Sequence, residues 1–178
     1  MSPAAGFQID LKNYVRDIPD FPKPGVLFKD ITPLLKDAQA FRVAVESIIA
    51  PHRSQKITHV VCVEARGFIF GSAAAAALGV GFVPIRKQGK LPYKTYDAAY
   101  DLEYGAGVLS VHQDALGPDD RVLIVDDLLA TGGTVGAVAK LIEQCGAKIE
   151  ALVFLVELDF LNGRKKLGTY PIHSVLRY

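Results

Sequence analysis

The residues best suited to chemistry lie in one stretch of the second half of the chain, VLIVDDLLATGGTV at residues 122–135. Asp126 and Asp127 stand side by side at its centre, and a glycine-rich loop follows at residues 130–134. The backbone N–H groups of such a loop, leading into a helix N-terminus, form a binding site for an anion. Two adjacent carboxylates repel that anion, so we expect them to bind hydroxyl groups nearby or a hydrated Mg²⁺ ion. A phosphate in the loop and a diol on the acids describe a ribose 5-phosphate.

The residues of this phosphate loop contribute backbone amides and, from the threonines, hydroxyl donors. They are Ala130, Thr131, Gly132, Gly133 and Thr134. The motif alone is weak evidence for a phosphate site, because many helices begin after Gly-Gly. In the alternative interpretation, the two acids cap the approach to the helix and the glycines form a turn. The loop lacks the lysine of a Walker A motif, and no G-x-G-x-x-G opens a helix after a strand. A P-loop NTPase and a dinucleotide-binding fold are therefore not predicted.

A second group of charged residues lies before the middle of the chain, where residues 86–96 hold four cations and no acid. They are Arg86, Lys87, Lys90 and Lys94. A charge run is usually a solvated surface, but the chain has a formal net charge of only +1, so this local excess suits a diphosphate. With Gly89 and Pro92 interrupting regular structure, residues 87–105 are long enough to form a mobile lid. Arg66 is expected to reach the same anion, although alone it is equally a surface arginine in a turn.

Hydrophobic periodicity predicts the elements that position these groups. Continuous apolar stretches are typical of strands buried on both faces, and they occur at residues 57–64, 80–85, 121–126 and 151–158. A stretch with polar alternation, residues 107–116, is expected nearer a sheet edge. Helices are expected after the cap Asp37, from about Phe70 to Gly79, and over residues 134–146. The alternation predicts a single α/β domain with a mainly parallel twisted sheet flanked by helices, preceded by an irregular N-terminal segment.

Composition sets further limits. Half of the 178 residues are apolar and 22% are charged, which is typical of a globular domain. The near-neutral charge argues against a surface that binds nucleic acid. The N-terminus has no secretory signal, and the uncharged residues 67–85 are interrupted by glycines and Pro84, so we predict soluble core there rather than a membrane span. Cys62 and Cys145 are expected to be reduced thiols of a cytoplasmic protein with no membrane partner.

Five more segments, in order and over nearly the whole chain, complete a pattern with VLIVDDLLATGGT. They are FPKPGVLFKDITPLL, EARGFIFG, PIRKQGKLPYKT, LEYG and VELDFLNGRKKL. In these segments the chain resembles the type I phosphoribosyltransferases, and among them the adenine phosphoribosyltransferases. The resemblance implies transfer of the phosphoribosyl group of phosphoribosyl diphosphate (PRPP) to adenine, giving AMP and diphosphate. It also implies a homodimer, an N-terminal hood at residues 1–36, a lid at residues 87–105, and Mg²⁺ held mainly by PRPP and water rather than directly by the protein.

The resemblance further assigns a base pocket. It implies that Phe28 stacks on adenine opposite Leu128, while the backbone of Leu27 and Lys29 reads the base edge and Leu158 closes the pocket. Many relatives carry arginine at the position of Lys29, which matters less if the main chain makes the contact. Without the resemblance, Phe28 is an ordinary core aromatic.

The catalytic residues implied by the resemblance are in LEYG. Glu103 is the candidate general base for the N9 proton of adenine, and Tyr104 assists by packing or hydrogen bonding. Taken alone, Glu103 is a surface carboxylate. Arg86 and Lys87 are candidates to reach the site of a partner subunit.

Two other functions stay open. One is a phosphoribosyltransferase for another nucleobase, and the other is a PRPP-sensing regulator, which would need a DNA-binding module or a basic face.

Overall fold

The computed structural model describes residues 9–102 and 105–178, without the side chains of residues 101–106. The chain forms two compact units, which divide between Ser47 and Ile48 and are treated separately below. Within the described ranges, no helix has the length and apolar character needed to cross a membrane. The uncharged residues 67–85 instead form most of one helix and one strand.

The N-terminal unit contains a short β-hairpin and helices. Its elements are η1 (Leu11–Tyr14), β1 (Arg16–Pro19), β2 (Leu27–Asp30), α1 (Thr32–Lys36) and α2 (Ala38–Ile49), the last of which crosses into the second unit. The prediction of an irregular segment is wrong for residues 27–30, because β2 pairs antiparallel with β1. Strands of four residues carry too little alternation to be recognised in the sequence. The predicted cap is confirmed, since Asp37 Oδ1 accepts the backbone N–H groups of Gln39 and Ala40 at 2.9 and 2.8 Å.

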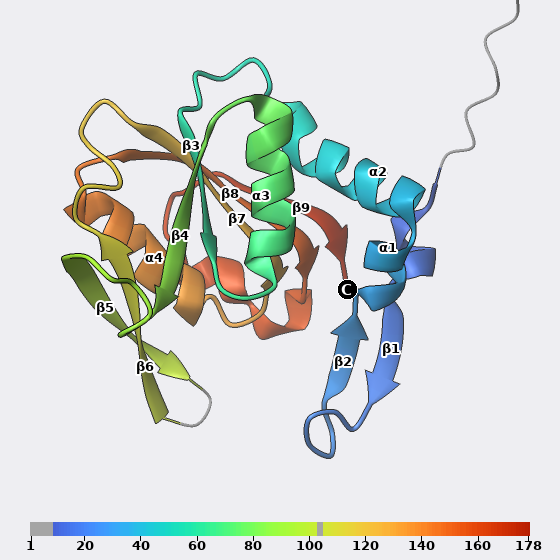
Figure 1. The fold of residues 1–178 in the computed structure, drawn as a ribbon. Coiled ribbons are helices and arrows are strands. Elements are labelled where there is room, and N and C mark those ends of the chain that lie inside the picture. The colour runs from blue at the N-terminus through green and yellow to red at the C-terminus, as the bar shows by residue number, and fades with distance from the viewer. Residues whose placement is uncertain (1–8, 103–104) are drawn as a thin grey trace, which may run out of the picture. The chain divides into compact units, whose positions relative to one another are not determined.

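The second unit is built on a seven-stranded sheet in the order β5-β6-β4-β3-β7-β8-β9 (Figure 1). The strands are β3 (His59–Val63), β4 (Gly81–Lys87), β5 (Thr95–Leu102), β6 (Gly105–His112), β7 (Arg121–Leu129), β8 (Lys148–Glu157) and β9 (Ile172–Arg177). Five are parallel, and β5 and β6 add an antiparallel hairpin beside β4. The predicted α/β fold with a mainly parallel sheet is therefore confirmed. The sequence did not predict β5 or β9.

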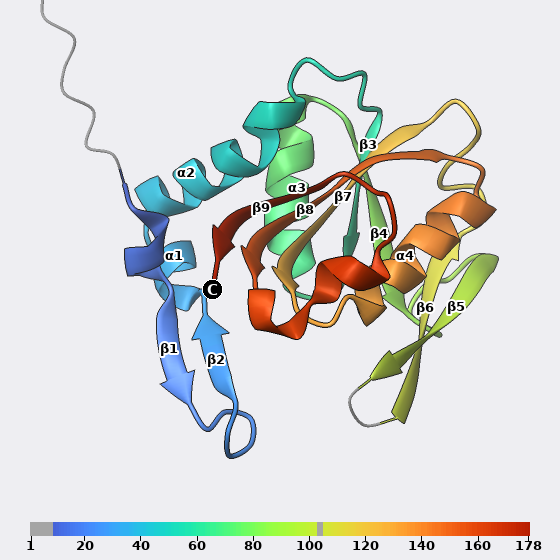
Figure 2. The ribbon, with the colours of Figure 1, turned by 180° about the vertical axis from the view of Figure 1, so that it is seen from behind.

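Helices cover both faces of this sheet. The helical segments are η2 (Ala50–His52), α3 (Gly67–Leu78), α4 (Gly133–Gln144), η3 (Asp159–Leu161) and η4 (Gly163–Lys166). Helix α3 lies in front of the sheet in Figure 1, and α4 lies in front in the opposite view of Figure 2. Helix α3 begins three residues before the predicted Phe70 and ends, as predicted, at Gly79, which has a φ of 70°. The amphipathic face of α4 buries Val135, Val138, Leu141 and Ile142 against the sheet.

The strand order reverses direction between β3 and β7. The chain passes from β3 through α3 to β4 on one side, and from β7 through α4 to β8 on the other. The pairing of β3 with β7 ends at Cys62 and Val125, whereas β7 stays paired with β8 as far as Leu129 and Glu157. Beyond Val125, β7 therefore leaves β3. In open α/β sheets such a switch point, at the carboxyl ends of the strands, is where ligands bind.

Candidate active site

The phosphate loop lies directly beyond the switch point. A cavity of about 80 Å³ is lined by Asp126 and by every residue from 128 to 135, so the five predicted loop residues are brought together there. The N-cap of α4 is Gly132, whose φ of 82° places it in the left-handed region. This residue has no side chain to cap the helix, so the first N–H groups of α4 face the cavity without a competing side-chain acceptor at that position.

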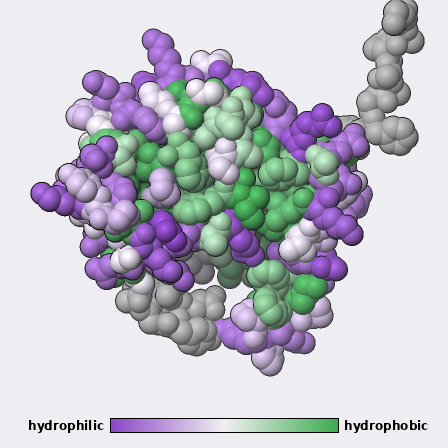
Figure 3. Space-filling view, in the orientation of Figure 1, coloured by the Kyte–Doolittle hydropathy of each residue, from purple (hydrophilic) through white to green (hydrophobic). Residues whose placement is uncertain are grey.

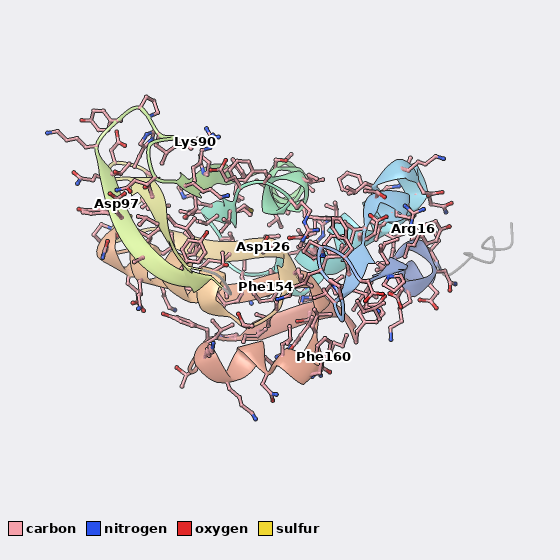
Figure 4. The ribbon with its side chains drawn as sticks, turned by 90° about the horizontal axis from the view of Figure 1, so that it is seen from below. Arg16, Lys90, Asp97, Asp126, Phe154 and Phe160 are labelled. Atoms are coloured by element: carbon pink, nitrogen blue, oxygen red, sulfur yellow. The ribbon has the colours of Figure 1, made fainter. Side chains whose placement is uncertain are left out.

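The two acids occupy different surroundings. Asp126 is half-buried beside Phe154 of β8 (Figure 4), and its Oδ1 accepts the backbone N–H of Asp127 at 2.9 Å. Helix α3 begins close against it, because a Cβ added at Gly67 would lie 2.7 Å from Asp126 Oδ1. Asp127 is only 7% exposed and pairs with Arg66, whose Nε lies 2.7 Å from Asp127 Oδ2. Asp127 does not line the small cavity; its ion pair connects β7 to Arg66, in the turn between β3 and α3.

The surroundings of both acids disfavour the ionised carboxylate. Desolvation by the surrounding protein, together with the negative charge of Asp127, raises the pKa of Asp126 well above its ordinary value of 3.8. Desolvation also raises the pKa of Asp127, and Arg66 opposes this shift without cancelling it. Hydroxyl groups or a hydrated cation at this position would offset the desolvation of the two carboxylates.

Arg86 and Lys87 form a second polar group at the end of β4. Both oxygens of Glu64 are engaged, because Oε2 accepts from Arg86 Nη2 at 3.0 Å and Oε1 accepts the backbone N–H of Lys87 at 2.7 Å. Burial disfavours the charge of Glu64, but these donors outweigh it and lower its pKa below 4.5. Arg86 Nη1 also donates to the carbonyl of Lys90 at 3.2 Å. Arg86, predicted as an anion ligand, is therefore bound within its own chain. Glu64 was not predicted from the sequence, although it ends the apolar stretch at residues 57–64 as Asp126 ends RVLIVD.

The predicted lid is largely an antiparallel hairpin. Strands β5 and β6 pair without interruption from Thr95 and His112 to Leu102 and Gly105. Only residues 88–94 connect β4 to this hairpin without regular structure, and Lys90 there is exposed (Figure 4). Glu103 and Tyr104, the predicted catalytic residues, lie outside the described residues.

The residues predicted for the base pocket lie in both units. In the N-terminal unit, Phe28 packs edge to face on Phe21 with ring centroids 5.1 Å apart, Leu27 is 48% exposed, and Lys29 Nζ lies 2.6 Å from Asp17 Oδ1.

In the second unit, Leu128 lines the phosphate cavity. Leu158 is buried, and its N–H donates to the carbonyl of Leu129 at 3.0 Å. Over the part of the chain that the structure describes, no three His, Cys, Asp or Glu side chains form a group that could hold a metal ion.

Comparisons with known proteins agree with this fold. The family model described as phosphoribosyl transferase domain matches residues 34–171. The adenine phosphoribosyltransferase of Nitrosococcus oceani is 56% identical over 168 residues, covering 94% of this chain and 98% of that protein. The corresponding protein of Methylococcus capsulatus is 57% identical with the same coverage.

Solved structures give the same result. The crystal structure of adenine phosphoribosyltransferase from Thermoanaerobacter pseudethanolicus superposes with a TM-score of 0.91 at 52% identity, covering 94% of this chain and 98% of that one. The Saccharomyces cerevisiae enzyme, complexed with adenine and an imino-altritol bisphosphate, gives 0.88 at 39% identity, covering 93% and 96%. With its parallel sheet, its phosphate loop and its acid pair at the switch point, the chain belongs to the adenine phosphoribosyltransferases.

Proposed function

We propose that this chain transfers the phosphoribosyl group of PRPP to adenine, giving AMP and diphosphate in purine salvage. The observation that carries the proposal is the glycine-rich loop at the N-terminus of α4 with Asp126 and Asp127 immediately before it, at the β3–β7 switch point. This arrangement suits a sugar phosphate whose hydroxyl groups face the acids. Its curated relatives carry the name of the same enzyme.

Each part of PRPP has a proposed set of ligands. The amides of residues 130–134 and the hydroxyl groups of their threonines bind the 5′-phosphate, and Asp126 and Asp127 bind the ribose diol. Arg66, which already reaches Asp127 at 2.7 Å, is placed to bind the diphosphate beside the sugar. The cations at the end of β4 and just after it neutralise the same leaving group, and they are Arg86, Lys87 and Lys90.

The residues present fit a magnesium ion that arrives with PRPP. Mg²⁺ prefers oxygen ligands and retains much of its water, and two desolvated carboxylates stand beside the proposed sugar site. Asp126 and Asp127 would hold its hydration shell rather than the ion itself. Bound in this way, the ion neutralises charge on the leaving diphosphate.

Catalysis requires alignment, charge neutralisation and removal of one proton. N9 of adenine attacks the anomeric carbon as diphosphate leaves, through an oxocarbenium-like transition state. We assign Glu103 as the base that takes the N9 proton and Tyr104 as its support, in the lid at residues 87–105. Glu103→Ala is expected to lower kcat about 10²- to 10⁴-fold while PRPP affinity changes only severalfold. An unchanged kcat would remove Glu103 from the mechanism.

The base pocket is assigned to the hood at residues 1–36, to Leu128 near the end of β7 and to Leu158 just after β8. Phe28 stacks on adenine opposite Leu128, the backbone of Leu27 and Lys29 reads the base edge, and Leu158 closes the pocket. The exposed Leu27 and the aromatic pair of Phe21 with Phe28 support a surface able to receive a planar base.

We further propose a homodimer in the cytoplasm. Helix α3 has no charged residue, and its outward side exposes Ile69, Ser72, Ala76 and Ala77. Figure 3 shows apolar surface over this helix. An exposed helix face without charge is typical of an interface. The free thiols of Cys62 and Cys145 suit a reducing compartment. Sedimentation equilibrium of the purified chain tests the dimer.

A base panel tests the activity. The purified chain is incubated with PRPP, Mg²⁺ and each nucleobase in turn, and nucleotide and diphosphate are measured. We expect product with adenine alone. Product with another base and none with adenine would favour the alternative transferase. PRPP binding without turnover on any base, combined with specific DNA binding, would favour the regulator.

A further inference from the structure

We propose that Arg164, through its ion pair with Glu157, holds the phosphate loop in its binding conformation and is therefore a positioning residue for PRPP. The inference rests on the proposed function of that loop. It concerns the segment VELDFLNGRKKL, in which only Leu158 has so far been given a role.

The loop is in close contact with the backbone of Gly163. A Cβ added at Gly132 would lie 2.7 Å from the carbonyl oxygen of Gly163. A Cβ added at Gly163 would lie 2.3 Å from the carbonyl oxygen of Ala130. Both distances are shorter than any normal contact, so two glycines are needed for the backbones to approach this closely. The position of Gly163 therefore sets the position of the loop residues whose amides face the cavity.

Arg164, the next residue, fastens Gly163 in place. Its Nε and Nη2 donate to Oε1 and Oε2 of Glu157 at 2.5 and 2.6 Å, which is a two-pronged guanidinium–carboxylate pair. Its Nη1 donates to the carbonyl of Ile172 at 3.2 Å. Ser174 donates its hydroxyl to Glu157 Oε2 at 2.6 Å and accepts from Arg164 Nη2 at 3.2 Å. One guanidinium thus connects η4 to both β8 and β9.

This ion pair lies beside the strand that carries the loop. Glu157 is 3% exposed and is aligned with Leu129, the last residue of β7, while the next residue, Leu158, donates its N–H to Leu129. The loop therefore leaves β7 where Glu157 is fixed, and it contacts Gly163 where Arg164 is fixed. The Arg164–Glu157 ion pair and the contact of Gly163 with the loop together form one continuous support from the end of β7 to the start of α4.

The support depends on the shape of the guanidinium as well as on its charge. Arginine presents paired N–H groups in a plane that match the two oxygens of a carboxylate, whereas lysine has one compact ammonium group. Arg164→Lys keeps the charge next to Gly163 but cannot donate to both oxygens with the same geometry. Displacing a binding group by about 1 Å can cost on the order of 100-fold in rate.

The test compares Arg164→Lys with the matched variant Arg177→Lys. Arg177, the last residue of β9, also lies near Glu157, with its Nε 3.8 Å from Glu157 Oε2, but it pairs with Asp159 at 3.0 Å and does not adjoin Gly163. Ribose 5-phosphate, which carries only the sugar and the phosphate, is titrated into each protein by calorimetry. For Arg164→Lys we expect binding weaker by about 10- to 100-fold, a matching rise in KM for PRPP, and a KM for adenine within twofold. Arg177→Lys should bind like the unchanged protein.

Several outcomes would overturn the proposal: unchanged ribose 5-phosphate affinity in Arg164→Lys, equal rises in both KM values, or the same loss in Arg177→Lys. If Arg164→Lys does not fold, Ser174→Ala removes one support of the ion pair, and we expect a several-fold loss with the same KM split; no loss there overturns the proposal as well. Failure of the proposed function is distinguishable, because the unchanged chain would then not bind ribose 5-phosphate at all.

Discussion

Three neighbouring strands of the sheet have acids near their carboxyl ends, and the acids of the middle strand differ from those on either side. Strand β7 carries Asp126 and Asp127, whose pKa values are raised. The adjacent strands β3 and β8 lead into Glu64 and Glu157, whose pKa values are lowered. At the carboxyl ends of these strands, the ionised carboxylate is thus stabilised at Glu64 and Glu157 and disfavoured at Asp126 and Asp127 between them.

The balance between desolvation and hydrogen-bond donors around each carboxylate explains the difference. Glu157 receives two nitrogens of Arg164 and the hydroxyl of Ser174, and Glu64 receives two nitrogens of Arg86 and a backbone N–H. These donors outweigh the cost of burial. Around the acids of β7, desolvation outweighs the donors. These donors are the backbone N–H of Asp127 for Asp126, and for Asp127 one nitrogen of Arg66, the side chain of Asp126 and the backbone of Asp127 and Leu128.

This difference divides the acids into structural acids and proposed ligand-binding acids. An acid that the protein satisfies fully contributes to stability and has little left to offer a ligand. An acid that the protein desolvates without enough donors costs stability, and a ligand that supplies hydroxyl groups or a hydrated cation relieves that cost. Replacing a proposed ligand-binding acid by its amide should therefore lower activity without lowering stability, whereas the same replacement at a structural acid should lower stability.

The largest expected effect is on activity, at Asp127. Asp127→Asn replaces a carboxylate with an amide, one of whose terminal atoms can no longer accept a hydrogen bond from the ribose. Two charge-assisted hydrogen bonds are worth about 3 kcal/mol, so we expect kcat/KM for PRPP to fall about 100-fold. The melting temperature should stay the same or rise. Steady-state kinetics and calorimetric unfolding measure both.

The matched control for this substitution is Asp119→Asn, at an exposed acid just before β7. It should change neither quantity. An Asp127→Asn variant with unaltered PRPP binding would show that the diol is bound elsewhere, and a large fall in its melting temperature would place Asp127 among the structural acids.

A smaller effect, on stability, is expected at Glu157. Glu157→Gln leaves Arg164 without its anion; because the arginine side chain is 37% exposed, we expect a loss of about 2 kcal/mol rather than the larger cost of a fully buried pair. Urea unfolding measures the loss. Asp159→Asn is the control, since its pair with Arg177 is exposed on both sides and should change the unfolding free energy by less than about 0.5 kcal/mol. Equal effects in the two variants would contradict the ranking.

The pH dependence sharpens the same contrast. The pKa of Glu157 is lowered by folding, so its contribution is complete above the ordinary value of 4.5 and is lost as pH falls through the folded-state pKa. The difference in unfolding free energy between the unchanged chain and Glu157→Gln should therefore be constant from pH 8 to 5 and shrink below pH 4.5. A difference that persists unchanged at pH 3 would mean that the charge of Glu157 contributes little.

Much of the fold could be predicted from the sequence because burial leaves a local pattern. Apolar runs identified the central strands, and Asp37 and Gly79 marked a helix start and a helix end. Strand β9 was missed because most of its residues are only half-buried, and β5 was missed because its residues were assigned to a loop. Both lie at the edges of the sheet, where one side lacks a neighbouring strand and the periodic signal is weaker.

The site was predictable where its residues are contiguous and not where they meet through pairing. The loop at residues 130–134 and its acids form one stretch, so the sequence could predict that they lie together, and the sugar phosphate they would bind stays a prediction. The pairs of Glu64 with Arg86 and of Glu157 with Arg164 depend on strand register and on the path of the chain after β8, which composition does not encode. Arg86 is an example: its charge was recognised in the sequence, but its ion pair with Glu64 was not.

The smallest effect is expected at Asp126, and its sign is opposite to that at Glu157. Because folding raises the pKa of Asp126, the unchanged chain loses stability as pH rises above 3.8 through the folded-state pKa, whereas an asparagine does not titrate. Asp126→Asn keeps the oxygen that accepts the N–H of Asp127. The unfolding free energy of Asp126→Asn minus that of the unchanged chain should therefore rise by up to about 1 kcal/mol between pH 4 and pH 8. PRPP binding should weaken in the same variant. Urea unfolding across this range decides the point: a difference that stays constant or falls toward pH 8 would mean that Asp126 is satisfied as an anion, like its neighbours on β3 and β8.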